Sequence, residues 1–182
     1  MSALRRSLVA GLVVLAVVAA LLSFNLFLLG RRWSRVGPLV AGSAAPDFVL
    51  PAATGPRLRL SEQRARLVLL DFWAAWCGPC MRAMPALGAL QRDLGPLGLQ
   101  IVSINVDGDT ESARAATRTL GPAVPVLVDQ GEVSNRYGVH VLPYLVLVGR
   151  DGRIVDVRSG PLREDKLREQ LRRLLGAPAA AR

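Results

Sequence analysis

The hydrophobic positions beyond residue 45 follow two periods, which predict strands and helices within one α/β domain. An unbroken apolar run from Leu67 to Phe72 is typical of a strand that is buried on both faces. Apolar residues at helical spacing predict a helix from Pro79 to Leu94, with Gly95 placed to end it. This strand–helix pair is the frame around which the remaining elements are expected.

Shorter patterns predict those elements. Further strands are expected at residues 46–51, 57–60, 99–106, 124–128, 144–148 and 153–157. Further helices are expected at residues 61–63, 111–120, 132–137 and 162–175. In the last helix four leucines are expected to face inward, namely Leu167, Leu171, Leu174 and Leu175. The first two strands should pair as a hairpin, and the order of the rest predicts a mixed sheet with helices on both faces.

The N-terminal part of the chain carries a long uncharged segment. Leu8 to Leu29 is a run of 22 residues, and about 20 apolar residues are needed to cross a bilayer. A cleaved signal peptide is the alternative, but its apolar region is usually only about 7–15 residues long. The run therefore favours an uncleaved transmembrane anchor. Similar numbers of arginines flank both ends, so charge does not decide its orientation.

These patterns divide the chain into four parts. Residues 1–35 are expected to form an N-terminal segment with the transmembrane helix, and residues 36–45 a linker. Residues 42–176 are expected to form the folded domain, and residues 177–182 a flexible tail. A domain of this length can bury a core without disulfide support.

Charge and composition exclude several classes of protein. The formal net charge is +9, from 23 basic and 14 acidic residues. Five of the arginines flank the apolar segment, namely Arg5, Arg6, Arg31, Arg32 and Arg35. Without them the chain has 18 basic and 14 acidic residues. The remaining basic residues are scattered along the sequence, which argues against nucleic acid as a partner. Two cysteines and a single histidine exclude a zinc site built from cysteine and histidine.

The two cysteines, Cys77 and Cys80, stand at the predicted start of the helix. A thiolate at a helix N-terminus is stabilised by backbone N–H groups and the helix dipole, which makes Cys77 the attacking sulfur. Pro79 suits the first turn, and Gly78 lets a partner chain approach closely. Cys80 lies one turn further on and is expected to resolve the mixed disulfide. A purely structural disulfide closing so short a loop would stabilise the fold little, so the spacing favours redox chemistry.

The segment from Phe72 to Cys80 resembles the active-site signature of the thioredoxin superfamily. Together with the N-terminal apolar segment, the motifs Ala45–Leu50, Met84-Pro85 and Tyr137–Val139 make residues 42–176 similar to the TlpA/ResA-like membrane-anchored thiol–disulfide oxidoreductases. That group includes the cytochrome c maturation thioredoxins. The resemblance implies a thioredoxin-like fold, a mixed sheet flanked by helices with an N-terminal hairpin extension, and no cofactor beyond the redox-active dithiol.

The resemblance also implies roles for particular residues. Asp71 matches a buried acid behind the cysteines, which would have a raised pKa and take a proton from Cys80 through water. Pro143 matches a cis-proline that faces the disulfide and exposes the backbone of Leu142 to a substrate strand. The expected substrate-binding residues are Trp76, Gly78, Pro79, Leu142 and Pro143. The alternative for Asp71 is an acid whose hydrogen bonds come from backbone donors. The alternative for Pro143 is an ordinary trans proline in a turn.

Three positions depart from the pattern of the relatives. Ala83 stands where many relatives have a glutamate, so Asp71 alone would carry the acid–base role. Val141 and Tyr144 stand where glycine and threonine are usual, which predicts a narrower or more apolar substrate groove. His140 lies near this edge of the groove. It is expected to be either a surface or packing residue, or a pH-sensitive contact with the substrate.

The expected function is that of a tethered reductase of protein disulfides on the extracytoplasmic side of the cell membrane. A DsbD/CcdA-type membrane protein is the expected electron donor, and apocytochrome c thiols are one candidate substrate. Two alternatives stay open: an oxidant or isomerase of the same fold, and a membrane-bound module that binds partners without turnover. The residues Gly78-Pro79 resemble those of reducing thioredoxins.

Overall fold

The computed structural model describes residues 11, 13, 15–25, 39–63 and 66–176 of the 182-residue chain. The chain separates into two units, one up to residue 38 and one from Leu39 onward, and each is described by itself. In the first unit, residues 15–25 are helical, and most of the rest of the predicted span 8–29 lies outside the described residues. Within the part that is described, no helix is both long enough and apolar enough to cross a membrane. The predicted tail at 177–182 also lies outside the described residues.

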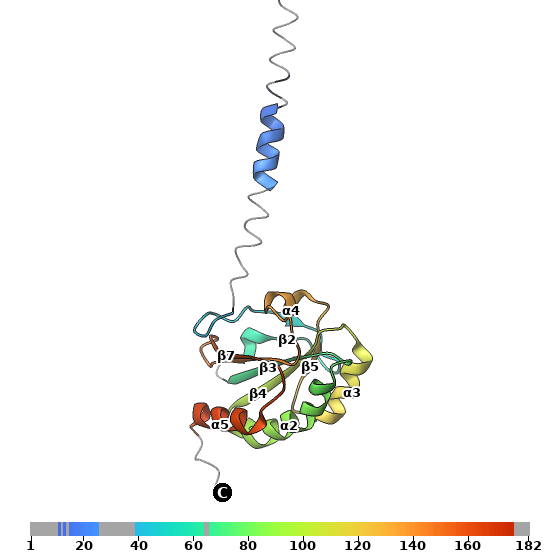
Figure 1. The fold of residues 1–182 in the computed structure, drawn as a ribbon, viewed down its shortest axis with the longest axis vertical. Helices are drawn as coiled ribbons and strands as arrows, with labels where there is room; N and C mark the ends of the chain where they lie inside the picture. The colour runs from blue at the N-terminus through green and yellow to red at the C-terminus, as the bar shows by residue number, and fades with distance from the viewer. Residues whose placement is uncertain (1–10, 12, 14, 26–38, 64–65, 177–182) are drawn as a thin grey trace, which may run out of the picture. The chain divides into compact units, whose positions relative to one another are not determined.

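A five-stranded mixed sheet forms the centre of the second unit (Figure 1). Its strands are β3 (Leu67–Trp73), β4 (Leu99–Asn105), β5 (Val126–Val128), β6 (Tyr144–Val148) and β7 (Ile154–Ser159). Their order is β5-β4-β3-β6-β7, with β3, β4 and β5 parallel and with β6 and β7 antiparallel to their neighbours. The apolar run predicted as a central strand is therefore the middle strand of the sheet. A separate hairpin pairs β1 (Val49–Leu50) with β2 (Leu58–Arg59), as predicted.

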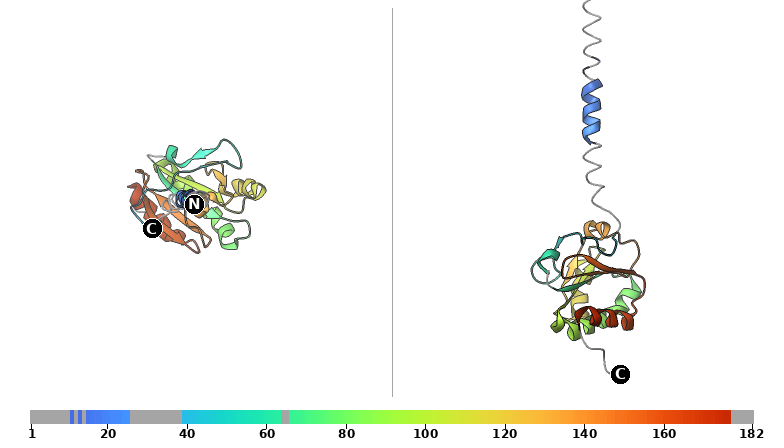
Figure 2. Two further views of the ribbon diagram at one scale, coloured as in Figure 1. Left: turned by 90° about the horizontal axis from the view of Figure 1, so that it is seen from above. Right: turned by 90° about the vertical axis from the view of Figure 1, so that its left-hand side faces the viewer.

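Helices and the hairpin cover the two faces of this sheet. The helices are α2 (Gly78–Leu94), α3 (Thr110–Leu120), α4 (Glu132–Arg136) and α5 (Glu164–Leu175), with 3₁₀ turns η1 (Leu60–Gln63) and η2 (Gly95–Leu97). One hydrophobic cluster joins the sheet to α2, α3 and α5, and a second joins its other face to α4 and the hairpin. Figures 1 and 2 show these two layers on opposite sides of the sheet. The predicted thioredoxin-like mixed α/β fold is confirmed.

The alternation of side chains along β3 decides which residues face the helix that follows it. Leu69 and Trp73 belong to the cluster that contains both cysteines, while Leu70 and Phe72 belong to the other cluster. Because successive side chains of a strand point to opposite faces, Asp71 lies on the face of Leu69 and Trp73. The single acidic residue of this buried strand therefore faces the same side of the sheet as the cysteines.

Gly95 ends α2 as predicted, since the helix stops at Leu94 and Gly95 is its C-cap residue. Its φ is −56°, so the chain continues into η2 before Gly98 takes φ of 104°. One detail of the sequence prediction is wrong. Leu174 does not face inward but is 45% exposed, whereas Leu167 and Leu171 are buried as predicted. The difference arises at the end of α5, because the local pattern does not show which neighbours cover a last helical turn.

Candidate active site

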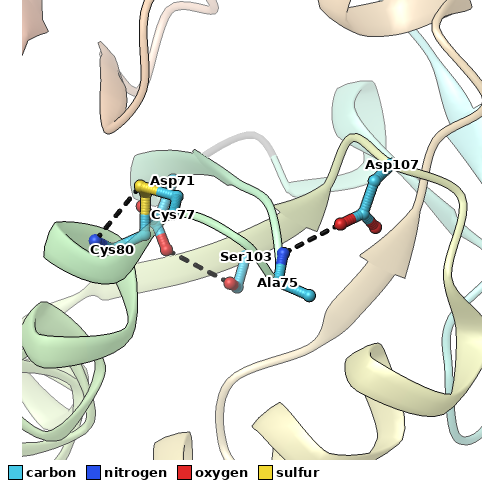
Figure 3. Close-up of a disulfide and its surroundings, with 6 residues drawn as sticks. All are labelled: Asp71, Ala75, Cys77, Cys80, Ser103 and Asp107. Carbon is cyan, nitrogen blue, oxygen red and sulfur yellow. Dashed lines mark hydrogen bonds between the residues drawn. A yellow bond between two sulfur atoms is a disulfide. The ribbon is translucent and has the colours of Figure 1, made fainter.

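Cys77 and Cys80 form a disulfide at the N-terminus of α2 (Figure 3). Cys77 is the N-cap residue, with extended backbone angles, and its Sγ accepts a hydrogen bond of 3.3 Å from the backbone N–H of Cys80. Pro79 stands in the first turn, where its missing N–H leaves no helix bond unmade. In the reduced protein the same N–H and the helix dipole would stabilise a Cys77 thiolate.

The disulfide is nearly buried, but the backbone on one side of it is open. Cys77 is 5% exposed and Cys80 is 3% exposed. Their neighbours Ala75 and Gly78 are exposed, and the Trp76 side chain is 75% exposed. The exposed surface beside the sulfurs is therefore the one that Trp76 and Gly78 form.

Asp71 is a buried acid on the same side of the sheet as the disulfide. The residue is 3% exposed, and burial raises the pKa of its carboxyl from 3.8 to about 7. A hydrogen bond of 3.2 Å from the Ser103 hydroxyl to Oδ2 opposes this rise (Figure 3). Within the described chain no backbone N–H donates to the Asp71 carboxylate, so the alternative of an acid satisfied by backbone donors is wrong.

Ser103 is a residue that the sequence reasoning missed. It is fully buried on β4 and is the register partner of Asp71 on β3. Its signal in the sequence was a single hydroxyl between the apolar, β-branched residues Val102 and Ile104 of the strand. The pairing register of the two strands was needed to place it beside the carboxylate.

Asp107 is the second residue that was missed. Its Oδ2 accepts a hydrogen bond of 2.8 Å from the backbone N–H of Ala75 (Figure 3), and its Oδ1 accepts one of 3.2 Å from the backbone N–H of Asp109. Asp107 therefore fixes the loop that carries Trp76 to the loop that follows β4. Its position just after a buried strand was the available signal.

The Leu142–Pro143 peptide bond is cis, as predicted. The Pro143 carbonyl accepts a hydrogen bond of 2.9 Å from the N–H of Gly160, which joins this turn to the end of β7. In the described chain, the backbone N–H and C=O groups of Val141 and Leu142 have no hydrogen-bond partner. Val141 is 59% exposed and Leu142 is half-buried. This backbone is thus available to pair with an added strand.

The positions that depart from the family pattern have different surroundings. Tyr144 packs against Phe72 with ring centroids 6.1 Å apart, on the face of the sheet away from the cysteines. Any narrowing of the groove therefore comes from Val141, and the part of the prediction that rested on Tyr144 is wrong. Ala83 is half-buried and His140 is exposed.

In the described part of the chain, no three histidine, cysteine, aspartate or glutamate side chains gather as a metal site.

A disulfide at a helix N-terminus, a buried acid and a cis-proline turn on a thioredoxin-like sheet define a thiol–disulfide oxidoreductase. Comparison with known proteins agrees. The Redoxin family matches residues 40–174. The chain is 29% identical to the thiol-disulfide oxidoreductase ResA of Geobacillus thermodenitrificans over 168 residues, which is 92% of this chain and 95% of that protein. It is 33% identical to ResA of Geobacillus kaustophilus over 134 residues, 73% of this chain and 77% of that protein.

A solved structure shows the same likeness. A putative thiol:disulfide interchange protein DsbE from Chlorobium tepidum superposes with a TM-score of 0.70 at 32% identity, covering 76% of this chain and 99% of that chain. The chain belongs to the Redoxin family, as a TlpA/ResA-like member of the thioredoxin superfamily.

Proposed function

We propose that this protein is a membrane-tethered reductase of protein disulfides that works outside the cytosol. The observation that carries the proposal is the Cys77–Cys80 disulfide at the N-terminus of α2, with the buried Asp71, whose pKa is raised to about 7, on the same side of the sheet. A carboxyl with that pKa exchanges a proton readily at neutral pH, which disulfide exchange requires at each step.

The proposed reaction starts from the reduced dithiol. The Cys77 thiolate attacks one sulfur of the substrate disulfide, so that a mixed disulfide forms and the other substrate sulfur leaves as a thiolate. Asp71 then takes the proton of Cys80, and the Cys80 thiolate attacks the Sγ of Cys77. The second substrate sulfur leaves, both substrate thiolates take up protons, and the disulfide seen in this structure remains.

The substrate segment is proposed to lie across the exposed Trp76 and the turn at Pro143. The unpaired backbone of Val141 and Leu142 can hydrogen-bond to an extended chain. Gly78 and Pro79 complete the contact surface beside the sulfurs. The exposed apolar side chain of Val141 favours substrates with an apolar residue next to the reactive cysteine.

Tethering and compartment are part of the proposal. The apolar segment 8–29 supports an anchored protein. The resemblance to the membrane-anchored TlpA/ResA-like oxidoreductases supports a domain outside the cytosol. The electron donor would then be a membrane protein of DsbD/CcdA type. Apocytochrome c thiols are one candidate substrate, and other disulfide-containing proteins are the wider class.

Capture of substrates tests this function. A Cys80→Ser variant keeps the attacking thiol but cannot resolve, so it should accumulate mixed disulfides that mass spectrometry identifies. The matched control, Cys77→Ser, should capture far less. If neither variant captures a protein in cells, the alternative of a binding module without turnover would be favoured.

The direction of electron flow needs a separate measurement. A reduction potential near about −270 mV would support a reductase, whereas a value near about −180 mV or higher would support the alternative of an oxidant or isomerase. The Gly78-Pro79 pair favours the reductase.

A further inference from the structure

The end of the sheet opposite the disulfide carries a cluster of arginines and exposed leucines. There β3 and β4 begin, β6 ends and α2 and α5 end. We call this surface the basic end. It consists of Arg66, Arg92, Leu97, Arg150, Arg172, Arg173 and Leu174.

Contacts around Gly98 hold the parts of the basic end together. The Gly98 carbonyl accepts a hydrogen bond of 2.9 Å from Leu67, the residue after Arg66. A Cβ at Gly98 would lie 3.3 Å from Nη2 of Arg150 and 3.9 Å from Cδ2 of Leu175. Segments that are distant in the sequence therefore bring their arginines to one surface.

Two arginines of the basic end, Arg150 and Arg173, form no ion pair with a carboxylate among the described residues. Asp93 interacts electrostatically with Arg92 and Arg172, although its closest contact is with Arg168 at 2.6 Å. Arginines in a last helical turn are expected to offset the helix dipole, but Arg66 and Arg150 lie outside helices. The helix dipole therefore does not account for the whole cluster.

Exposed leucines lie among these charges. Leu97 and Leu174 are each 45% exposed. The other exposed large apolar side chains of α2 and of the two loops near the disulfide are Trp76, Met81 and Val141. The proposed substrate surface explains Trp76 and Val141. Arginine and leucine side by side on a surface are typical of segments that rest in a membrane interface.

Residues 42–45 of the second unit also lie at this end. The N–H of Gly42 donates to the Ile154 carbonyl at 2.7 Å, and the N–H of Ala45 donates to the Gly152 carbonyl at 3.0 Å. Residues 42–45 thus run along the turn between β6 and β7, which contains Arg150. In Figure 1 this segment, β7 and α5 lie on the same side of the domain.

We propose that the basic end rests on the anionic phospholipid headgroups of the membrane, with Leu97 and Leu174 at the interface. The seven residues of β3 separate this surface from the disulfide by about 20 Å, so the dithiol is presented away from the lipid. This inference rests on the proposed tethering, and it adds a second contact that fixes how the tethered domain is turned. The attraction between an anionic membrane surface and each nearby arginine raises the docked-to-undocked ratio roughly fivefold.

Lipid quenching of a fluorescent label tests the orientation. The label is attached to Leu97→Cys in the full-length, oxidised protein, and vesicles of phosphatidylcholine with one quarter phosphatidylglycerol carry a nitroxide quencher. The Leu97 label should be quenched, whereas a matched label at the exposed Thr110→Cys, at the disulfide end, should not. The double variant Arg150→Gln/Arg173→Gln should lower the docked-to-undocked ratio about 30-fold, while Arg118→Gln/Arg163→Gln leaves it unchanged.

Several results would overturn the proposal. They are equal quenching at Leu97 and Thr110, quenching that is as strong in phosphatidylcholine alone, and no effect of the Arg150/Arg173 variant. The last result would point to an acidic protein partner for this surface if an effect then appeared in cell extracts. Tethering itself is judged separately by extraction with alkaline carbonate. Release of the protein would contradict the tether, whereas quenching before extraction still decides whether the basic end binds anionic lipid.

Discussion

Replacing Asp71 by asparagine should remove the group that couples this protein to pH near neutrality. Burial raises the pKa of Asp71 from 3.8 to about 7 in the folded protein. The folded state therefore binds one more proton than the unfolded state between about pH 4 and pH 7. The contribution of Asp71 to the free energy of unfolding must therefore fall as pH rises through that window, and above the window that contribution is lost.

The magnitude follows from the two pKa values. The interval between 3.8 and about 7 corresponds to at most about 4 kcal/mol at pH 8. The side chain is 3% exposed, so solvent screening reduces this little. Asparagine has nearly the same shape and can accept the Ser103 hydroxyl, but it never ionises. At pH 8 the oxidised Asp71→Asn protein should be more stable than wild type by about 2–4 kcal/mol, and at pH 4 the two should agree within about 1 kcal/mol.

Urea unfolding of the oxidised proteins at pH 4, 6 and 8 measures the stability difference. Rapid mixing of the reduced proteins with a disulfide substrate, followed by tryptophan fluorescence, measures resolution. The wild-type rate should rise through an inflection near pH 7. The Asp71→Asn rate should be about 100-fold lower and lack that inflection.

A second variant tests the cause of the pKa. The Ser103 hydroxyl lowers the pKa of Asp71, so Ser103→Ala should move the inflection to higher pH. The reasoning is refuted if Asp71→Asn keeps the wild-type pH profile in both assays. A shift of the Ser103→Ala inflection to lower pH would refute the assigned role of the hydroxyl.

Three further predictions concern packing, capping and substrate contact. A Cβ at Gly88 would lie 2.6 Å from the Leu120 carbonyl oxygen, so Gly88→Ala should lower the free energy of unfolding by about 1–3 kcal/mol in urea. Asp109 caps α3 by accepting two backbone N–H bonds, so Asp109→Ala should lower the urea midpoint at pH 7. Because hydrogen bonds hold the pKa of Asp109 low, this difference should disappear as pH falls through that pKa. Trp76→Ala should lower kcat/KM about tenfold for a protein disulfide but hardly change it for a small one.

Each of these predictions has a matched control. Gly78→Ala should change stability little, because the nearest atom to its Cβ is the flexible guanidinium of Arg82 at 3.4 Å. Glu111→Ala should leave the urea midpoint nearly unchanged, since its ion pair with Arg114 is exposed and long at 4.0 Å. Met81→Ala, on the exposed face of α2, should affect both disulfides alike. In each pair, an equal loss of stability, or an equal change in kcat/KM, for the variant and its control would contradict the reasoning.

The sequence alone determined the order of the elements and the chemistry of the centre. An apolar run long enough for one strand and a helical spacing after it placed Cys77 at a helix start, because these periods are set by local backbone geometry. The resemblance carried by the cysteine motif indicated the buried acid Asp71 and a cis bond before Pro143. The helix start depends only on neighbours along the chain.

Only the tertiary structure decided how distant segments meet. The register of β3 and β4 placed Ser103 beside Asp71, and the loop after β4 placed Asp107 on the N–H of Ala75. The exposure of Leu174, and the meeting of Leu175 and Arg150 at Gly98, likewise depend on how α5 packs against this loop. A one-residue slip in register would send every side chain of a strand to the other face, and local sequence does not encode that register. The acid, its hydroxyl partner and the basic end therefore become visible only once the sheet is assembled.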